Sequence, residues 1–212
     1  MKEILNFLIE IGELKRKKRR GWVVHQIKNP ETTAEHIFRL TFLSWFLGKQ
    51  KRLNLERVIK IALIHDLCEV YAPDLTPYDP LLPKNQKKIT EVLKRWPAFT
   101  PALKKEKERQ KSKMESKGLD KLISKLPTDL RAEIKHLWLD FEKGLTKEGR
   151  FVKQADKTEN FLQGIEYWKK YGRIQHKLWD RWIKEILDDP ALLEFIEVLE
   201  RKFFKNKKRK ET

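Results

Sequence analysis

Apolar residues recur at three- and four-residue steps along most of the chain, which is the spacing of one face of an α-helix. No stretch keeps the strict alternation of apolar and polar residues that a half-buried strand needs, and only 8 of the 212 residues are glycine. The pattern predicts an all-α fold. A first helix is expected over residues 2–16, with an apolar stripe formed by Ile4, Leu5, Leu8, Ile11 and Leu14.

Two capping signals predict where the next helices begin. Thr32 and Glu35 have the spacing of a capping box, in which the hydroxyl and the carboxylate each accept a hydrogen bond from a free backbone N–H group. This helix should run to about residue 49, and the basic stretch before it, broken by Gly21 and Pro30, should be irregular. A third helix should begin after Asn54 and carry its apolar residues up to residue 66.

Proline positions divide the rest of the chain. Residues 70–83 contain four prolines, cannot be helical throughout and are expected to form a loop. The Lys-rich residues 84–126 predict one or two amphipathic surface helices whose charged face is solvated. Further helices are expected over the second half of the chain, at about 127–144, 146–172, 176–188 and 190–205.

Size and composition favour a single globular domain inside the cell. A chain of 212 residues, 40% of them hydrophobic, can build one well-buried core. The first 20 residues mix charged with apolar residues, and no apolar run approaches the roughly 18 residues of a membrane span, so neither a signal peptide nor a membrane helix is expected. The one cysteine, Cys68, permits no internal disulfide, which points to the cytoplasm.

The net charge of +17 has three interpretations. Basic clusters at residues 15–20 and 205–210 would neutralise nucleic-acid phosphates, or they would raise the local concentration of small anionic substrates. A chain with 37% charged residues, rich in Lys and Glu, is also typical of heat-adapted proteins with ion-paired surfaces. The charge alone therefore selects no function.

Polar residues on apolar helix faces are the first candidates for chemistry. His36 shares a face with Leu40 and Leu43, so its imidazole should point into the protein, where a histidine is most often a hydrogen-bonded core residue. The side chains of His65 and Asp66 are expected to project from the core-facing side of the third helix. An ionised aspartate is costly to bury without a cation or donors, although a helix cap or a salt bridge would also satisfy Asp66.

Asp156 is a further candidate, in the middle of the predicted helix at 146–172. Aspartate is a poor helix-interior residue, but exposure beside Lys153 or Lys157 is an ordinary alternative. Two imidazoles and two carboxylates would suit Mn, Co, Ni, Zn or Fe(II), and an ion held in this way polarises a phosphoryl oxygen and lowers the pKa of bound water. The four candidate ligands are His36, His65, Asp66 and Asp156.

The order of these residues, H…HD…D, resembles the HD superfamily of metal-dependent phosphohydrolases. The resemblance covers about residues 1–172 and is closest to the HD-domain branch of 5′-deoxynucleotidases. It is carried by GWV at 21–23, NPETTAEHIFRL at 29–40, ALIHDLCEVYAPDLTP at 62–77, LPTDLRAEI at 126–134 and FVKQADKTEN at 151–160.

The resemblance implies one HD-domain helical bundle over residues 1–205, with a Lys-rich helical insertion at about 84–118 and a basic tail at 206–212. It implies a divalent metal ion held by the four candidate ligands. It also implies a cytoplasmic homodimer that removes phosphate from deoxyribonucleoside 5′-monophosphates.

Roles for neighbouring residues also follow from the resemblance. Glu69, in the motif HDxxE, and Asp74, in the loop after it, match the catalytic carboxylates, with Asp74 as general acid or base and Glu69 assisting or orienting. A surface cap is the alternative for either. Trp22 matches a tryptophan that packs against the sugar where a 2′-hydroxyl would sit. An arginine that contacts phosphate precedes it, and we expect this to be Arg19, with Arg20 as the alternative.

The chain departs from the family pattern in its middle. Some relatives carry an acidic run before the segment that matches LPTDL, whereas here a mostly basic stretch offers only Glu106, Glu108 and Glu115. A second magnesium site is therefore not expected. Three other histidines match no ligand position: His25, His136 and His176.

Two other functions stay open. One is an HD phosphodiesterase or triphosphohydrolase that acts on other nucleotides, which the matches at Trp22 and Asp74 disfavour. The other is a basic nucleic-acid-binding module on an inactive HD scaffold, which would bind with a steep salt dependence and release no phosphate. The intact set of ligand residues disfavours this second alternative.

Overall fold

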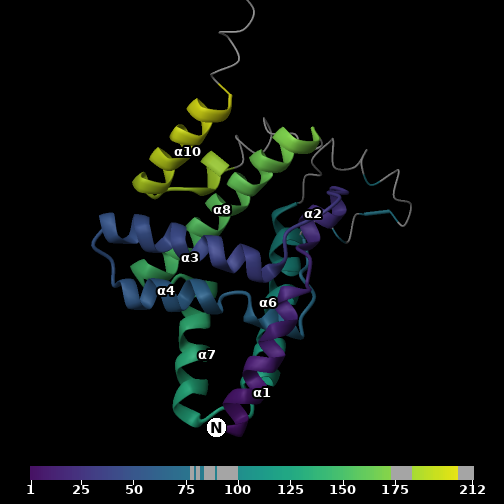
Figure 1. Ribbon diagram of the computed structural model, residues 1–212, viewed down its shortest axis with the longest axis vertical. Coiled ribbons are helices and arrows are strands. Elements are labelled where there is room, and N and C mark those ends of the chain that lie inside the picture. Colours follow the sequence, from purple (N-terminus) through teal and green to yellow (C-terminus); the bar gives the residue numbers. More distant parts are fainter. Residues whose placement is uncertain (77–78, 80–81, 84–88, 90–99, 173–182, 205–212) are drawn as a thin grey trace, which may run out of the picture.

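The computed structural model describes residues 1–76, 79, 82–83, 89, 100–172 and 183–204 (Figure 1). Within these ranges the chain forms helices and no strand, and an isolated antiparallel bridge joins Lys18 to Thr32. The all-α prediction is confirmed. The described residues leave out most of residues 84–99 of the insertion expected at about 84–118, most of the helix expected at 176–188 and the basic tail.

The N-terminal segment is helical over the expected length, but the basic link after it differs from the prediction. Helix α1 (Lys2–Ile11) continues directly into the 3₁₀ helix η1 (Gly12–Lys15). The link, expected to be irregular, contains the short helix α2 (Arg20–Val24). Gly21 does not prevent this, because it lies in the first turn, where backbone N–H groups have no intrahelical partner.

The two helices that precede the HD pair begin where their caps predict. Helix α3 (Thr33–Gln50) has a complete capping box between Thr32 and Glu35. Helix α4 (Leu55–Ile64) begins after Asn54, whose side chain accepts a hydrogen bond from the backbone N–H of Arg57. A 3₁₀ helix, η2 (Leu67–Val70), follows the HD pair before the Pro-rich segment.

The second half of the chain contributes four long helices. They are α6 (Pro101–Ile123), α7 (Thr128–Lys143), α8 (Lys147–Tyr171) and α10 (Pro190–Phe203). Helices α7 and α8 each end at a glycine in the left-handed conformation, Gly144 at φ 60° and Gly172 at φ 66°. These ends match the sequence prediction because glycine adopts this conformation without steric cost.

Helices α3, α4 and α8 build the centre of the domain. Helices α3 and α4 pack against each other, and α8 crosses both, with α7 on α4 and α8 and α10 against α8 (Figure 1). The core between them is fully buried and includes Leu40, Ile61, Val152 and Ala155. None of the described helices is long and apolar enough to cross a bilayer. The three central helices carry the candidate ligands.

Helix α6 packs against η2 at one glycine. A Cβ atom on Gly118 would lie 2.7 Å from the carbonyl oxygen of Cys68 and 3.1 Å from the Cβ of Ala72, so only glycine permits this approach. The following turn buries Leu119 and Ile123 in the core. The expectation of a surface helix therefore describes the Lys-rich beginning of α6, while its end belongs to the core.

Candidate metal centre

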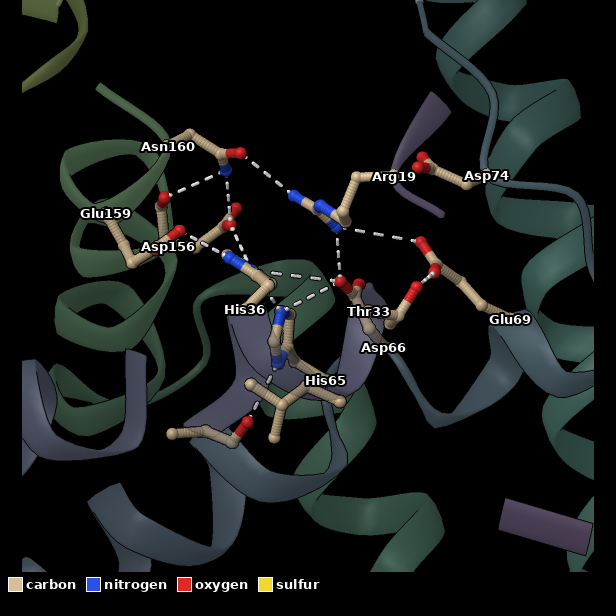
Figure 2. Close-up of polar contacts among 12 residues, drawn as sticks. Arg19, Thr33, His36, His65, Asp66, Glu69, Asp74, Asp156, Glu159 and Asn160 are labelled. Atoms are coloured by element: carbon tan, nitrogen blue, oxygen red, sulfur yellow. Dashed lines mark hydrogen bonds and ion pairs between the residues drawn. The ribbon is translucent and has the colours of Figure 1, made fainter. Parts of the chain in front are cut away.

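The two histidines face each other inside the protein (Figure 2). His36 is the fourth residue of α3, and His65 is the C-terminal cap of α4. Both side chains are buried, and their Nε2 atoms are 3.3 Å apart. Packing of α3 on α4 thus brings together two imidazoles that are 29 residues apart in the sequence.

The other nitrogen of each ring has a partner of its own. The Nδ1 atom of His36 contacts the carboxylate of Glu159 on α8, and the Nδ1 atom of His65 lies 2.9 Å from the backbone carbonyl of Ala62. Such partners fix the orientation of a metal-binding histidine and keep the proton on Nδ1. Both Nε2 lone pairs can therefore point to the same place.

Two carboxylates complete the cluster. Asp156 Oδ1 lies 3.2 Å from the Nε2 of His36, and Asp66 Oδ2 lies 3.1 Å from the Nε2 of His65 and 3.9 Å from that of His36. Ligand atoms at ~2.1 Å from a shared ion are about 3 to 3.5 Å from one another in tetrahedral or octahedral geometry. The donor atoms of His36, His65 and Asp156 all lie within 4.8 Å of one another and fit a divalent metal ion in donor type and spacing, and Asp66 Oδ2 borders this set beside His65.

The structure also tests the structural roles that the sequence left open for Asp156, Asp66 and His36. Asp156 is buried, so the alternative of an exposed aspartate is wrong, although Lys157 pairs with its Oδ2 at 2.7 Å. Asp66 makes no side-chain hydrogen bond as a cap, but it does form a salt bridge of 2.7 Å with Arg19. His36 is a hydrogen-bonded core residue and faces the cluster as well.

Arg19 connects Asp66 with Asp156 through Asn160. Its Nη1 lies 2.7 Å from Asp66 and 3.8 Å from Glu69, and its Nη2 donates to the side chain of Asn160 at 3.0 Å. Asn160 in turn donates to Asp156 Oδ1 at 2.8 Å. The side chain of Arg19 therefore touches the site, as the sequence analysis expected of it.

Arg20 faces the loop instead. Its Nε donates to Asp79 at 2.8 Å, and its backbone N–H donates to Asp74 Oδ2 at 2.7 Å. The Asp79 carboxylate also accepts hydrogen bonds from the backbone and the hydroxyl of Thr76. The structure thus separates the two neighbouring arginines, which the sequence alone left as alternatives.

Glu69 and Asp74 lie on one side of Arg19, opposite Asn160 (Figure 2). Glu69 is buried, and its Oε2 accepts a hydrogen bond of 2.7 Å from the hydroxyl of Thr33. Its burial excludes the alternative of a surface cap. Asp74 is half-buried in the loop after η2. The carboxylates of Glu69 and Asp74 therefore lie next to the Arg19 side chain, on its side away from Asn160.

Trp22 is held rigidly beside this region. Its Nε1 donates to Glu31 at 2.8 Å, and its ring meets the ring of Tyr167 edge-on, with centroids 5.2 Å apart. The hydroxyl of Tyr167 accepts a hydrogen bond from the backbone N–H of Glu31. The indole is 2% exposed and has no room to change its orientation.

Several residues of the site were not selected from the sequence. Glu159 and Asn160 follow Asp156 by one helical turn on α8, and this spacing is the signal that would have found them. Arg39 holds the second oxygen of Glu159 at 2.6 Å and also contacts Gln163 at 2.5 Å. No local pattern connects Arg39 to Glu159, since they are 120 residues apart.

Neither His25 nor His136, the other two described histidines, belongs to a group that could hold a metal ion. His136 contacts Arg57 at 3.3 Å, and burial lowers the pKa of His25 to about 4. His176 lies outside the described residues. None of the described pairings of His25 or His136 includes a candidate ligand.

Both carboxylate ligands are poised in the ionised form. Burial opposes the ionisation of each, but His65 and Arg19 lower the pKa of Asp66. In the same way, Lys157 and His36 lower the pKa of Asp156 well below its usual range. Ionised carboxylates are the form that binds a cation.

His36 and Glu69 have pKa values above their usual ranges. Burial and Arg19 oppose protonation of His36, but Glu159 raises its pKa to about 10. Burial, together with the negative charge of Asp66, raises the pKa of Glu69 well above its usual range. A metal ion bound to the Nε2 of His36 would have to displace the proton that the raised pKa places on this ring.

A family model described as HD domain matches residues 11–184. The 5′-deoxynucleotidase HDDC2 of Homo sapiens is 33% identical over 177 residues, which are 82% of this chain and 74% of that protein. The 5′-deoxynucleotidase hdd1 of Schizosaccharomyces pombe is 32% identical over 200 residues, covering 88% of this chain and 89% of that one. This chain belongs to the HD-domain family of 5′-deoxynucleotidases. The family expected from the sequence motifs is thereby confirmed, together with its metal-dependent phosphohydrolase class.

Solved structures share the fold of this HD-domain protein. A conserved hypothetical protein from Pyrococcus furiosus superposes with a TM-score of 0.64 and 27% identity, over 93% of this chain and 99% of that one. A Magnetospirillum magnetotacticum protein described as a "Predicted metal-dependent phosphohydrolase" gives a TM-score of 0.63 at 21% identity, over 96% and 94% of the two chains. At that identity the second likeness shows the fold alone.

Proposed function

We propose that this HD-domain protein removes phosphate from deoxyribonucleoside 5′-monophosphates with one bound divalent metal ion. The observation that carries the proposal is the convergence of two buried imidazole Nε2 atoms with the buried carboxylate of Asp156, beside the partly buried carboxylate of Asp66. Its relatives in Homo sapiens and Schizosaccharomyces pombe, named 5′-deoxynucleotidases, support the substrate class.

His36, His65, Asp66 and Asp156 would hold the ion. A mixed set of nitrogen and oxygen ligands suits a transition metal, and we propose Mn, Co, Ni, Zn or Fe(II). When bound, such an ion supplies a Lewis acid and lowers the pKa of a water molecule. The Glu159 and Ala62 partners of the two rings keep both Nε2 atoms aimed at the ligand position.

Arg19 is proposed to bind the phosphate. Its guanidinium donates to Asp66 and to Asn160, both of which border the cluster, so a phosphate oxygen beside the ligands would lie within its reach. A guanidinium presents several donors in one plane, which matches a phosphate group.

Asp74 and Glu69 are proposed to move and orient protons. Asp74 stands in a loop close to Arg19, where it can deliver a proton to the leaving 5′-oxygen or accept one from water. Glu69 is held by Thr33 and by its approach to Arg19, so it can orient the same water. Neither side chain needs to leave its place in the structure for this.

Trp22 is proposed to exclude a 2′-hydroxyl from the sugar site. The indole is fixed by Glu31 and packs on Tyr167, so it cannot move aside for a larger sugar. A rigid wall discriminates against an added group more strongly than a mobile side chain does.

The protein is proposed to act as a cytoplasmic homodimer. Its one cysteine, Cys68, is buried and free, which suits a reducing compartment. The net charge of +17 would concentrate anionic nucleotides near the site and agrees with a heat-adapted surface. Residues 1–205 form the single HD domain in this proposal, and residues 206–212 form a basic tail after it.

Phosphate release from deoxyribo- and ribonucleoside 5′-monophosphates tests the function. Wild-type protein is stripped with a chelator, restored with each metal in turn and compared with Asp66→Ala. Metal-restored wild type should release phosphate from deoxyribonucleotides well above the Asp66→Ala background. Equal, background-level rates would refute the enzyme, and equal rates on ribonucleotides would refute the role of Trp22 while leaving the metal site intact.

A further inference from the structure

Helix α3 exposes four large aromatic side chains on the face opposite to its buried one. Phe38, Phe42, Trp45 and Phe46 are 66%, 40%, 39% and 56% exposed. The rings contact one another, with the Phe42 centroid 5.1 Å from that of Phe38 and 5.7 Å from that of Phe46. We call these four residues the aromatic stripe. The opposite face of the same helix buries His36 and Leu40.

The aromatic stripe is about as large as the largest apolar patch that a typical monomer exposes, and such patches are often functional. About half of each ring is exposed, and a buried aromatic side chain covers roughly 200 Å², so the stripe exposes on the order of 400 Å². A contiguous apolar patch of this size marks an interaction surface. A standard interface buries about 800 Å² per partner, and an apolar centre of about half that area inside a polar rim is its usual anatomy.

The charges at the ends of the stripe make it self-complementary. Glu35, Phe38, Phe42, Trp45 and Lys49 follow one another at alternating steps of three and four residues, so they form one line along the helix. Glu35 and Lys49 are exposed and carry opposite charges at the two ends of this line. Both lie seven residues from Phe42, one on each side.

We propose that the aromatic stripe is the two-fold interface between two copies of this chain, with Phe42 at the axis. In an antiparallel pair of α3 helices centred there, Phe38 packs beside the partner's Phe46. Glu35 then lies opposite the partner's Lys49, and the two-fold symmetry places this ion pair in the interface twice. The inference names the surface of the homodimer put forward under Proposed function and rests on that dimer.

The charge distribution favours a second copy over other occupants. The chain carries a net charge of +17, so two copies repel each other over most of their surface. The line from Glu35 to Lys49 is neutral as a whole, and it pairs unlike charges when it meets its own copy. A membrane surface would instead select an apolar stripe bordered by basic residues at both ends.

Sedimentation velocity of the full-length protein tests the interface. Wild type should sediment as a dimer and Phe42→Glu as a monomer, with the dissociation constant raised at least about 100-fold by two charges placed on the axis. Leu8→Glu is the matched control, because Leu8 is an exposed apolar residue on α1. Leu8→Glu should remain a dimer, and circular dichroism of both variants checks that they are folded.

Cross-linking tests the register. A short bis-maleimide should join Phe42→Cys into covalent dimers, since the axis brings the two copies of that position together. Phe38→Cys should cross-link poorly alone and well when combined with Phe46→Cys. The native Cys68 is buried and gives the background rate in wild type. Lys49→Glu should weaken the dimer, and high salt should reduce the difference from wild type.

The outcomes separate the interface from the enzyme. A monomeric wild type, a dimer that Phe42→Glu leaves intact or a dimer that Leu8→Glu breaks would overturn the interface. So would Phe42-dependent binding of monomers to vesicles of phosphatidylserine. An active monomeric wild type would refute the interface and keep the enzyme, whereas a Phe42-dependent dimer that releases no phosphate would refute the enzyme and keep the interface.

Discussion

The Nδ1 atom of His36 contacts the carboxylate of Glu159, and Arg39 holds the other oxygen of that carboxylate at 2.6 Å. The chain of contacts runs from a half-buried arginine, through a fully buried glutamate, to the Nε2 atom that faces His65. It decides which nitrogen of His36 is available to a metal ion. Glu159 is therefore a positioning residue of the site.

Replacing Glu159 by Gln should weaken metal binding by about 10- to 100-fold, because the amide no longer fixes the tautomer and basicity of His36. Competition titration with a metal indicator measures this directly. Glu166→Gln is the control, since Glu166 pairs with Arg39 near the surface and does not touch His36. Equal metal affinities for the two variants would contradict a positioning role for Glu159.

Arg19→Ala should lower kcat/KM for deoxyribonucleotides by about 10- to 100-fold, because charge-assisted hydrogen bonds contribute about 1.5–3 kcal/mol. Most of the change should be in KM, as expected for phosphate binding. Arg20→Ala loses only a half-exposed ion pair with Asp79 and should behave like wild type. Steady-state kinetics of both variants would reverse the assignment if Arg20→Ala were the defective one.

Trp22→Phe should lower the free energy of unfolding by about 1–3 kcal/mol, because the buried Glu31 then lacks its indole donor. Urea denaturation measures the loss. In a double-mutant cycle with Glu31→Ala, the two effects should not add, since both remove the same hydrogen bond. Additive losses would mean that the Trp22–Glu31 contact contributes nothing to stability.

Gly118→Ala should reduce the free energy of unfolding by about 1–3 kcal/mol, because the added methyl group meets the Cys68 carbonyl at 2.7 Å. The displaced segment carries Glu69, so phosphate release should fall as well. Gly12→Ala is the matched control: nothing lies within 4 Å of its Cβ, and its φ of −57° suits alanine. Thermal melts that show no difference between the two variants would exclude the close packing of α6 on η2.

Glu115 should make stability depend on pH. Burial raises its pKa from 4.5 to about 7; the ion pair with Lys111 at 3.4 Å opposes the shift, and Glu142 and Asp66 add to it. The folded protein therefore binds this proton more tightly than the unfolded chain does. Its contribution to stability is fully present below about pH 4.5 and is lost as pH rises through about 7, by on the order of 3 kcal/mol.

Glu115→Gln isolates that contribution. The variant should match wild type near pH 4 and become more stable than wild type by about 2–3 kcal/mol near pH 8, because glutamine has no proton to lose. Denaturant titrations of both proteins across this range give the difference directly. A difference that stays constant with pH would contradict the raised pKa of Glu115.

Residues close together in the sequence determine where several of the helices begin and end. The capping box of Thr32 with Glu35, the Asn54 cap and the glycines at 144 and 172 all act within one helical turn, so their effect can be predicted from adjacent residues. Sequence motifs likewise selected the four candidate ligands. The short helix α2 was missed because its five residues, RGWVV, are too few to show a helical period and include a glycine.

Tertiary structure decided everything that depends on neighbours distant in the sequence. Arg19 and Arg20 are chemically alike and adjacent, and only the packing of their turn against η2 and the following loop sends one to Asp66 and the other to Asp79. The contact between His36 and Glu159 spans 123 residues. The aromatic stripe of α3 remains exposed, because only the surrounding helices determine which face of a helix they cover.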